Sequence, residues 1–154
     1  MSLTERLQDD MKHAMRDGDA HRRDTLRMAS AAAQLSAQDK RSALTDEETI
    51  DVLGREVKKR RESVAAYESA GRKDLAAREQ AEIDILAPYL PEQLGEDEIR
   101  ALAREAVSAS GATSARDIGR VMSLLMPRVK GRADGKLVSS IVSEVLARAQ
   151  GTEA

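Results

Sequence analysis

Pro88-Tyr89-Leu90-Pro91 is the stretch that divides this sequence. Two prolines three residues apart cannot lie inside one regular helix, because each ring removes a backbone donor and clashes with the preceding turn. On both sides of this stretch apolar residues recur at helical spacing, and no segment alternates with the two-residue period of a strand. We therefore predict an all-α protein with two parts, an N-terminal helical domain over residues 1–90 and a C-terminal three-helix domain over residues 91–150.

Upstream of the prolines, local signals predict where the helices begin and end. Gly18 separates two apolar stripes, each repeating every three to four residues. Thr45-Asp46-Glu47-Glu48 is a capping box, in which the threonine hydroxyl and the second glutamate satisfy free backbone N–H groups at a helix start. Gly71 is expected to end or bend the helix that this box opens, and a shorter helix then runs up to the prolines.

Downstream of the prolines, three shorter helices are expected. Gly95-Glu96-Asp97-Glu98 places acidic residues in a first helical turn, where they suit the helix dipole. Gly111 stops that helix, and Pro127 is expected to end the next one. Asp134 then caps the last helix, whose apolar face carries valine, leucine and isoleucine. These three helices form the C-terminal unit.

The composition excludes several classes of protein. The chain has 154 residues, a formal net charge of -2 and no cysteine, so disulfides, thiolate metal sites and cysteine nucleophiles are absent. Tyr67 and Tyr89 are its only aromatic residues, too few for a platform on which single-stranded bases stack. The N-terminus has no signal-peptide pattern, and no apolar run reaches membrane-spanning length. We predict a cytoplasmic protein without a membrane partner.

The sharpest local feature is a basic segment that contains a glycine-bearing loop. Between Arg116 and Lys136 there are six positive and two negative residues, a local net charge of +4 in a chain that is slightly acidic overall. Glycines that precede a helix start let a phosphate approach backbone N–H groups, and basic side chains add affinity without reading sequence. The alternative is a tight turn between helices with solvated basic residues. The predicted RNA-binding residues are Arg116, Arg120, Arg128, Lys130, Gly131, Arg132, Gly135 and Lys136.

No comparable pattern points to catalysis or to a cofactor. The second basic run, Arg55 to Arg61, is either a solvated helix face with ion pairs to Glu56 and Glu62 or an RNA-facing ridge. His13 and His21 are the only histidines, and we predict surface positions for both and no metal site. The serines lie outside any nucleophile-elbow pattern. We therefore predict no catalytic residues, no metal and no cofactor.

Three segments together resemble the YqeY-like family, also called GatB/YqeY-domain proteins. They are Leu26-Arg27-Met28, Tyr89-Leu90-Pro91-Glu92-Gln93-Leu94, and Met126 to Val138 with its Lys130-Gly131-Arg132-Ala133-Asp134-Gly135-Lys136 string. The likeness runs in the family's order from about Leu3 to Leu146. It implies an all-helical fold whose C-terminal part is similar to the tail of the B subunit of the tRNA-dependent amidotransferase, and similar modules accompany some glutaminyl-tRNA synthetases.

The resemblance implies a non-catalytic accessory module that binds tRNA through backbone contacts, or that binds an aminoacyl-tRNA synthetase or amidotransferase complex. One alternative is a protein–protein adaptor without RNA contact. Another is an amidotransferase-associated component, because the activity of a carbon–nitrogen ligase with glutamine as amido-N-donor accompanies the family. That reaction needs an ATP site and a glutaminase, and the sequence has no motif for either.

Overall fold

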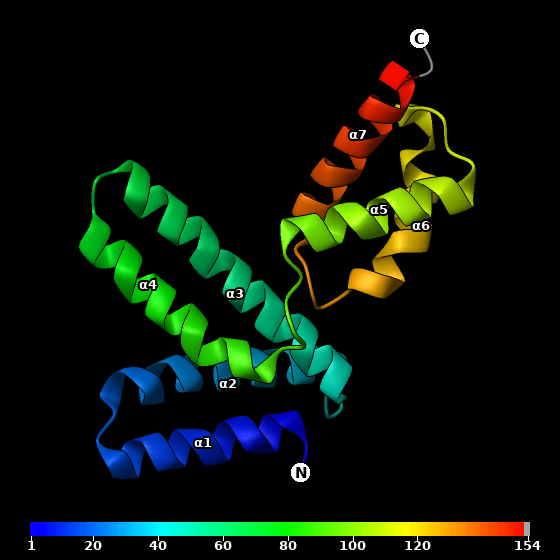
Figure 1. Ribbon diagram of the computed structural model, residues 1–154. Helices are drawn as coiled ribbons and strands as arrows, with labels where there is room; N and C mark the ends of the chain where they lie inside the picture. The colour runs from blue at the N-terminus through cyan, green and yellow to red at the C-terminus, as the bar shows by residue number, and fades with distance from the viewer. Residues whose placement is uncertain (153–154) are drawn as a thin grey trace. The chain divides into compact units, whose positions relative to one another are not determined.

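The computed structural model describes residues 1–152 and is all-α: within that range there is no β-strand. The predicted fold class, a multihelical N-terminal part with a C-terminal three-helix unit, is confirmed. The chain forms two compact units, one from Met1 to Leu90 and one that begins at Pro91, and each is described separately below (Figure 1).

The first half of the N-terminal unit is a helical hairpin. Helix α1 (Leu3–Asp17) packs along α2 (Ala20–Lys40), and the short connection between them is visible at the blue end of Figure 1. Gly18 connects them with φ of 73°, in the left-handed region where glycine carries no Cβ penalty. The predicted break at Gly18 is thus confirmed, and glycine suits this position because the backbone there is left-handed.

The second half is a longer hairpin of α3 (Asp46–Ser69) and α4 (Lys73–Leu86), which runs into the single turn η1 (Ala87–Tyr89). The predicted capping box opens α3, since the Glu48 N–H donates to the Thr45 hydroxyl at 3.2 Å and the Thr45 N–H donates to the Glu48 carboxylate at 2.8 Å. The ammonium of Lys40 is the larger cause that lowers the pKa of Glu48, and the Thr45 N–H adds to it.

Tyr89, between the two prolines, belongs to the core of this unit. Its side chain is 4% exposed and lies among Leu7, Leu26, Leu53 and Leu86. The hydroxyl donates a hydrogen bond to the carboxylate of Asp10 in α1, and burial and this carboxylate together raise the pKa of Tyr89 to about 12. The proline segment therefore ends the N-terminal unit with an anchored aromatic ring.

Arg60 departs from the expected solvated face of its basic run. It is 5% exposed on α3, and its guanidinium lies 3.1 Å from the carboxylate of Glu56 and 3.9 Å from that of Glu82 on α4. The neighbouring Arg55 and Arg61 are exposed, as a solvated face requires. The interpretation of the run as a solvated face was wrong for Arg60, because α4 covers this side of α3 and supplies a second carboxylate.

The C-terminal unit consists of α5 (Glu96–Ser110), the turn η2 (Ala115–Asp117), α6 (Ile118–Val129) and α7 (Gly135–Thr152). Helix α6 continues two residues beyond Pro127, which we expected to mark its end. A proline here removes only the hydrogen bond that its own N–H would donate to the Ser123 carbonyl, and helical bonding resumes after it, since the Lys130 N–H donates to the Met126 carbonyl at 2.9 Å.

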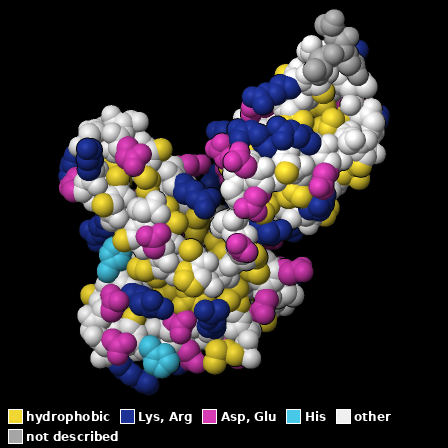
Figure 2. Space-filling view, in the orientation of Figure 1, with side chains coloured by type: hydrophobic (Ala, Val, Ile, Leu, Met, Phe, Trp, Pro, Cys, Tyr) yellow, Lys and Arg dark blue, Asp and Glu magenta, His cyan; other side chains and the backbone are white. Residues whose placement is uncertain are grey.

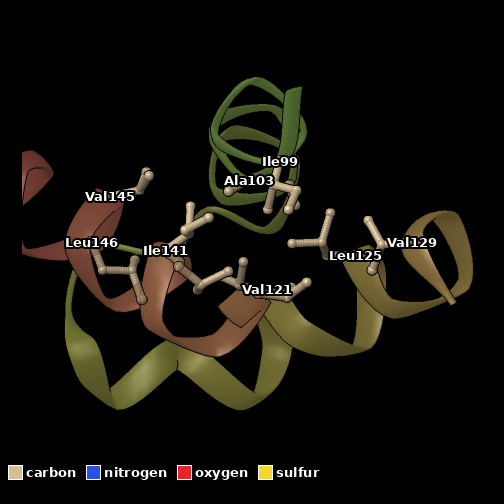
Figure 3. Close-up of a cluster of buried hydrophobic side chains, with 12 residues drawn as sticks. Ile99, Ala103, Val121, Leu125, Val129, Ile141, Val145 and Leu146 are labelled. Atoms are coloured by element: carbon tan, nitrogen blue, oxygen red, sulfur yellow. The ribbon is translucent and has the colours of Figure 1, made fainter. Parts of the chain in front are cut away.

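The core of this unit lies between the three helices (Figure 3). Ile99 and Ala103 of α5 face Val121 and Leu125 of α6, and α7 contributes Ile141, Val142 and Leu146 among others. All of them are aliphatic, as an aromatic-poor composition requires. This packing holds both ends of α6, and with them the two ends of the basic segment, in place.

Candidate nucleic-acid interface

The loop between α6 and α7 is a tight turn that glycine makes possible. Gly131 has a φ of 76°, a left-handed conformation that other residues adopt at a cost of about 1–2 kcal/mol. The N–H groups of Arg132 and Ala133 then both donate to the Val129 carbonyl, at 2.8 and 3.1 Å. The backbone of the loop thereby closes onto the end of α6, and the basic side chains project from a defined turn.

The linker after the prolines is hydrogen-bonded to this loop. The Leu94 N–H donates to the Arg132 carbonyl at 2.8 Å. The amide nitrogen of Gln93 donates to the Pro91 and Gly131 carbonyls at 2.8 and 2.9 Å. In return, the Arg132 guanidinium donates to the Glu92 carbonyl at 3.3 Å. We call these hydrogen bonds the linker–loop clamp; they bring together two of the three segments that carry the family resemblance.

The predicted basic residues fall into two groups at opposite ends of α6. Arg116 and Arg120 lie at its start, and Arg128 lies in its last turn beside the loop. Arg120 and Arg128 are eight positions apart on α6, and each helical residue adds about 1.5 Å, so the two groups are separated by roughly 12 Å along the helix. The structure therefore gathers Arg128, Lys130, Gly131, Arg132, Gly135 and Lys136 at one end, and does not bring Arg116 and Arg120 to them.

Several of these cations already have partners. Arg128 pairs with Glu105 of α5 at 2.8 Å, and Arg120 lies 3.8 Å from Asp117 while donating to the Ser110 carbonyl at 3.3 Å. Arg116 and Lys136 are exposed, and among residues 1–152 neither side chain forms an ion pair. The pairs of Arg128 and Arg120 are on the surface, so each contributes about 1 kcal/mol or less and a phosphate can compete with the carboxylate for the arginine.

The start of α7 differs from a phosphate-binding loop in one respect. The Asp134 carboxylate accepts the Lys136 N–H at 3.4 Å, so the predicted helix cap is present. An anion at this helix start would meet the negative charge of Asp134. The side chains of the loop, rather than its backbone N–H groups, are therefore the groups suited to contact phosphate.

Sequence reasoning missed two further arginines of this unit, Arg104 on α5 and Arg148 on α7. They line one groove, although 44 positions separate them. In both, the local sequence is that of an ordinary solvated helix face, and only the packing of α5 against α7 brings them together. The linker residues Glu92 and Gln93 were noted only as part of a family string, and no local signal assigns them a hydrogen bond with the loop.

Neither a metal-binding cluster of side chains nor a helix that could span a membrane is found in the described part of the chain. Residues 1–152 contain no group of three histidine or acidic side chains arranged to hold a metal ion. No helix in that range combines the length and the apolar character needed to cross a bilayer.

The fold and the site together define the class of this protein: it is all-α, and the segment after the prolines is hydrogen-bonded to a basic loop between two helices. Residues 4–146 match the profile of the family described as Yqey-like protein, and the chain belongs to this family. It is 32% identical over 144 residues to the protein of Pyrenophora tritici-repentis (strain Pt-1C-BFP) named "Altered inheritance of mitochondria protein 41, mitochondrial", covering 92% of this chain and 79% of that one. It is 28% identical over 90 residues to an uncharacterized protein of Schizosaccharomyces pombe (strain 972 / ATCC 24843), and this match covers 58% of this chain and 70% of that one.

Proposed function

We propose that this chain is a non-catalytic accessory module that binds tRNA, or a tRNA-charging or amidotransferase complex, through contacts to the RNA backbone. The observation that carries the proposal is the linker–loop clamp, whose hydrogen bonds tie down the loop backbone at Gly131 and Arg132, between Lys130 and Lys136. A fixed group of cations loses less conformational entropy on binding a phosphate than cations on a mobile loop. Membership of the Yqey-like family and the resemblance to the amidotransferase B-subunit tail add support.

Phosphate contact would use the loop end of α6 first. Lys130 and Lys136 are exposed, and the surface pair of Arg128 with Glu105 can exchange for a phosphate oxygen. Arg116 and Arg120 at the other end of α6 would contact a separate stretch of backbone. Such contacts give affinity without sequence readout, in agreement with the lack of aromatic residues in this unit.

The proposal is tested by filter binding of the full chain to total tRNA over a range of salt concentrations. Changing Lys130, Arg132 and Lys136 together to alanine should weaken binding and reduce the slope of log K against log salt by roughly 2–3, because each phosphate that is no longer neutralised lowers the slope by about 0.7–0.9. A control removes three exposed cations of the N-terminal unit, Lys12, Arg61 and Arg78. Equal affinities for the two variants, with both folded by circular dichroism, would refute the proposed surface.

The proposal assigns no catalytic step to this chain. Turnover by the purified protein that depends on both glutamine and ATP would instead establish an amidotransferase component. A cytoplasmic location remains part of the proposal, and the name of the Pyrenophora relative places that protein in mitochondria. Fractionation of the source cells, with the chain detected by antibody, tests the location independently of RNA binding.

A further inference from the structure

A groove between α5 and α7 is a second feature of the C-terminal unit that the tRNA proposal does not use. It has a volume of about 380 Å³ and is lined by Arg104, Val107, Ser108, Val145, Arg148 and Ala149. Figure 1 shows α5 and α7 starting close together and diverging toward their C-terminal ends, and the lining residues lie where they diverge. The groove is thus formed by two packed helices and needs no loop to close it.

The lining combines an apolar floor with a basic rim. Val107 and Ala149 are half-buried and Val145 is 8% exposed, so the floor is aliphatic. Arg104 lies one turn before Val107 on one wall, and Arg148 one turn after Val145 on the other. On the face shown in Figure 2, Lys and Arg side chains gather over α5 and α7 beside hydrophobic surface.

The rim already binds one carboxylate within the chain. Glu144 of α7 contacts Arg148 at 2.9 Å through one oxygen and Arg100 of α5 at 3.6 Å through the other. Two arginines therefore share this glutamate. Arg104 pairs with no acidic residue among residues 1–152, so the groove retains an unmatched positive charge at its rim.

We propose that this groove is a docking site for a helical segment of a partner protein that carries an apolar side chain flanked by carboxylates. An aliphatic floor favours an apolar side chain, which loses water on entering it, and the arginines select acidic neighbours. RNA fits less well, because the groove has no aromatic side chain for stacking and a phosphate backbone gains nothing from the valines. The inference does not depend on the proposed tRNA function.

The test is an NMR titration of the full, isotope-labelled chain with designed peptides. The probe is a 15-residue helical peptide on an alanine–glutamine background, with one leucine at its centre and a glutamate four residues before and after it. These three side chains share one helix face. We expect saturable shifts of the Val107, Ser108, Val145 and Ala149 amides below about 1 mM peptide. Control peptides replace both glutamates by glutamine, or the leucine by serine.

The matched variants change arginines on and off the groove. Arg104→Gln with Arg148→Gln should weaken peptide binding at least tenfold, whereas Arg61→Gln with Arg78→Gln on the N-terminal unit should leave it unchanged. Shifts that are absent, spread over both units, or equal for the glutamine peptide would overturn the inference. Equivalent shifts of the groove amides on adding total tRNA would assign the groove to RNA and also overturn the inference. A dimer of this chain that only the groove variant abolishes would overturn it as well. Loss of tRNA binding in the loop variant with peptide binding intact would separate this site from the proposed RNA surface.

Discussion

Replacing Gln93 by glutamate tests the linker–loop clamp with almost no change of shape. The Gln93 amide nitrogen donates to the Pro91 and Gly131 carbonyls at 2.8 and 2.9 Å. An ionised glutamate has the same length but no proton to donate. Both hydrogen bonds are therefore removed, and a negative charge is held against two carbonyl oxygens.

The size of the effect follows from these two hydrogen bonds. Each contributes about 0.5–1.5 kcal/mol, so removing both destabilises the C-terminal unit by about 1–3 kcal/mol. The repulsion between the carboxylate and the carbonyls adds to this. The total is a large part of the roughly 5–15 kcal/mol that stabilises a whole domain.

The destabilisation should depend on pH in one direction. The folded protein disfavours the ionised glutamate, which raises its folded pKa above the unfolded value of about 4.3. A raised pKa means that the deficit is small below about pH 4, where the protonated carboxyl can donate once, and grows as pH rises through the folded pKa. The difference between variant and wild type, measured at each pH, removes the acid sensitivity that both proteins share.

Urea unfolding followed by amide signals of the C-terminal unit measures the destabilisation, and hydrogen exchange of the Leu94 N–H reports the clamp itself. The control is Gln8→Glu, at an exposed position of α1, where a change within about 0.5 kcal/mol is expected. A Gln93→Glu variant as stable as this control at neutral pH, or one whose deficit does not shrink in acid, would show that the amide does not hold the loop.

Two further predictions concern the N-terminal unit. Arg60→Met should lower the unfolding free energy of the N-terminal unit by about 3–5 kcal/mol in urea denaturation, because Glu56 and Glu82 lose their buried partner. Replacing both glutamates by glutamine in the same variant should recover most of the lost stability. No recovery would mean that the loss comes from poorer packing instead. Tyr89→Phe should cost about 1.5–3 kcal/mol at neutral pH by removing the hydrogen bond to Asp10. The pKa of Tyr89 is raised to about 12 in the folded protein, so the stabilisation by the protonated hydroxyl is fully present below pH 10 and is lost as the pH rises toward 12. The unfolding free energies of wild type and variant should therefore converge between pH 10 and 12. Two curves that stay parallel over this range would contradict the assignment.

Features set by neighbouring residues were predictable from the sequence. The capping box at Thr45 and the breaks at Gly18 and Gly111 follow from one or two side chains and the backbone beside them. The all-α class follows from the apolar period, which repeats over most of the chain. Pro127 shows the limit of such rules, because a proline in a last turn resembles a terminator although the helix continues past it.

Features that depend on distant residues were not predictable in the same way. The Gln93 hydrogen bond to Gly131 spans 38 positions, and the pair of Arg128 with Glu105 spans 23. Summing the charges of the basic segment ignores the length of α6, and this helix keeps the two ends of the segment apart. A local net charge therefore predicted which residues are basic, but the packing decides which of them act together.

The linker–loop clamp should also affect RNA binding. If Lys130 and Lys136 contact phosphate, a loosened loop should lower affinity without any loss of charge, and the number of phosphates neutralised should stay the same. Gln93→Met, which removes both hydrogen bonds without adding a charge, should then weaken tRNA binding by less than the triple alanine variant of the loop, with a salt slope close to that of wild type. Counterion release scales with the number of neutralised phosphates, so a slope that falls as far as in the triple variant would mean that fewer phosphates are neutralised. An unchanged affinity in a variant with a demonstrably mobile loop would place phosphate binding elsewhere on the chain.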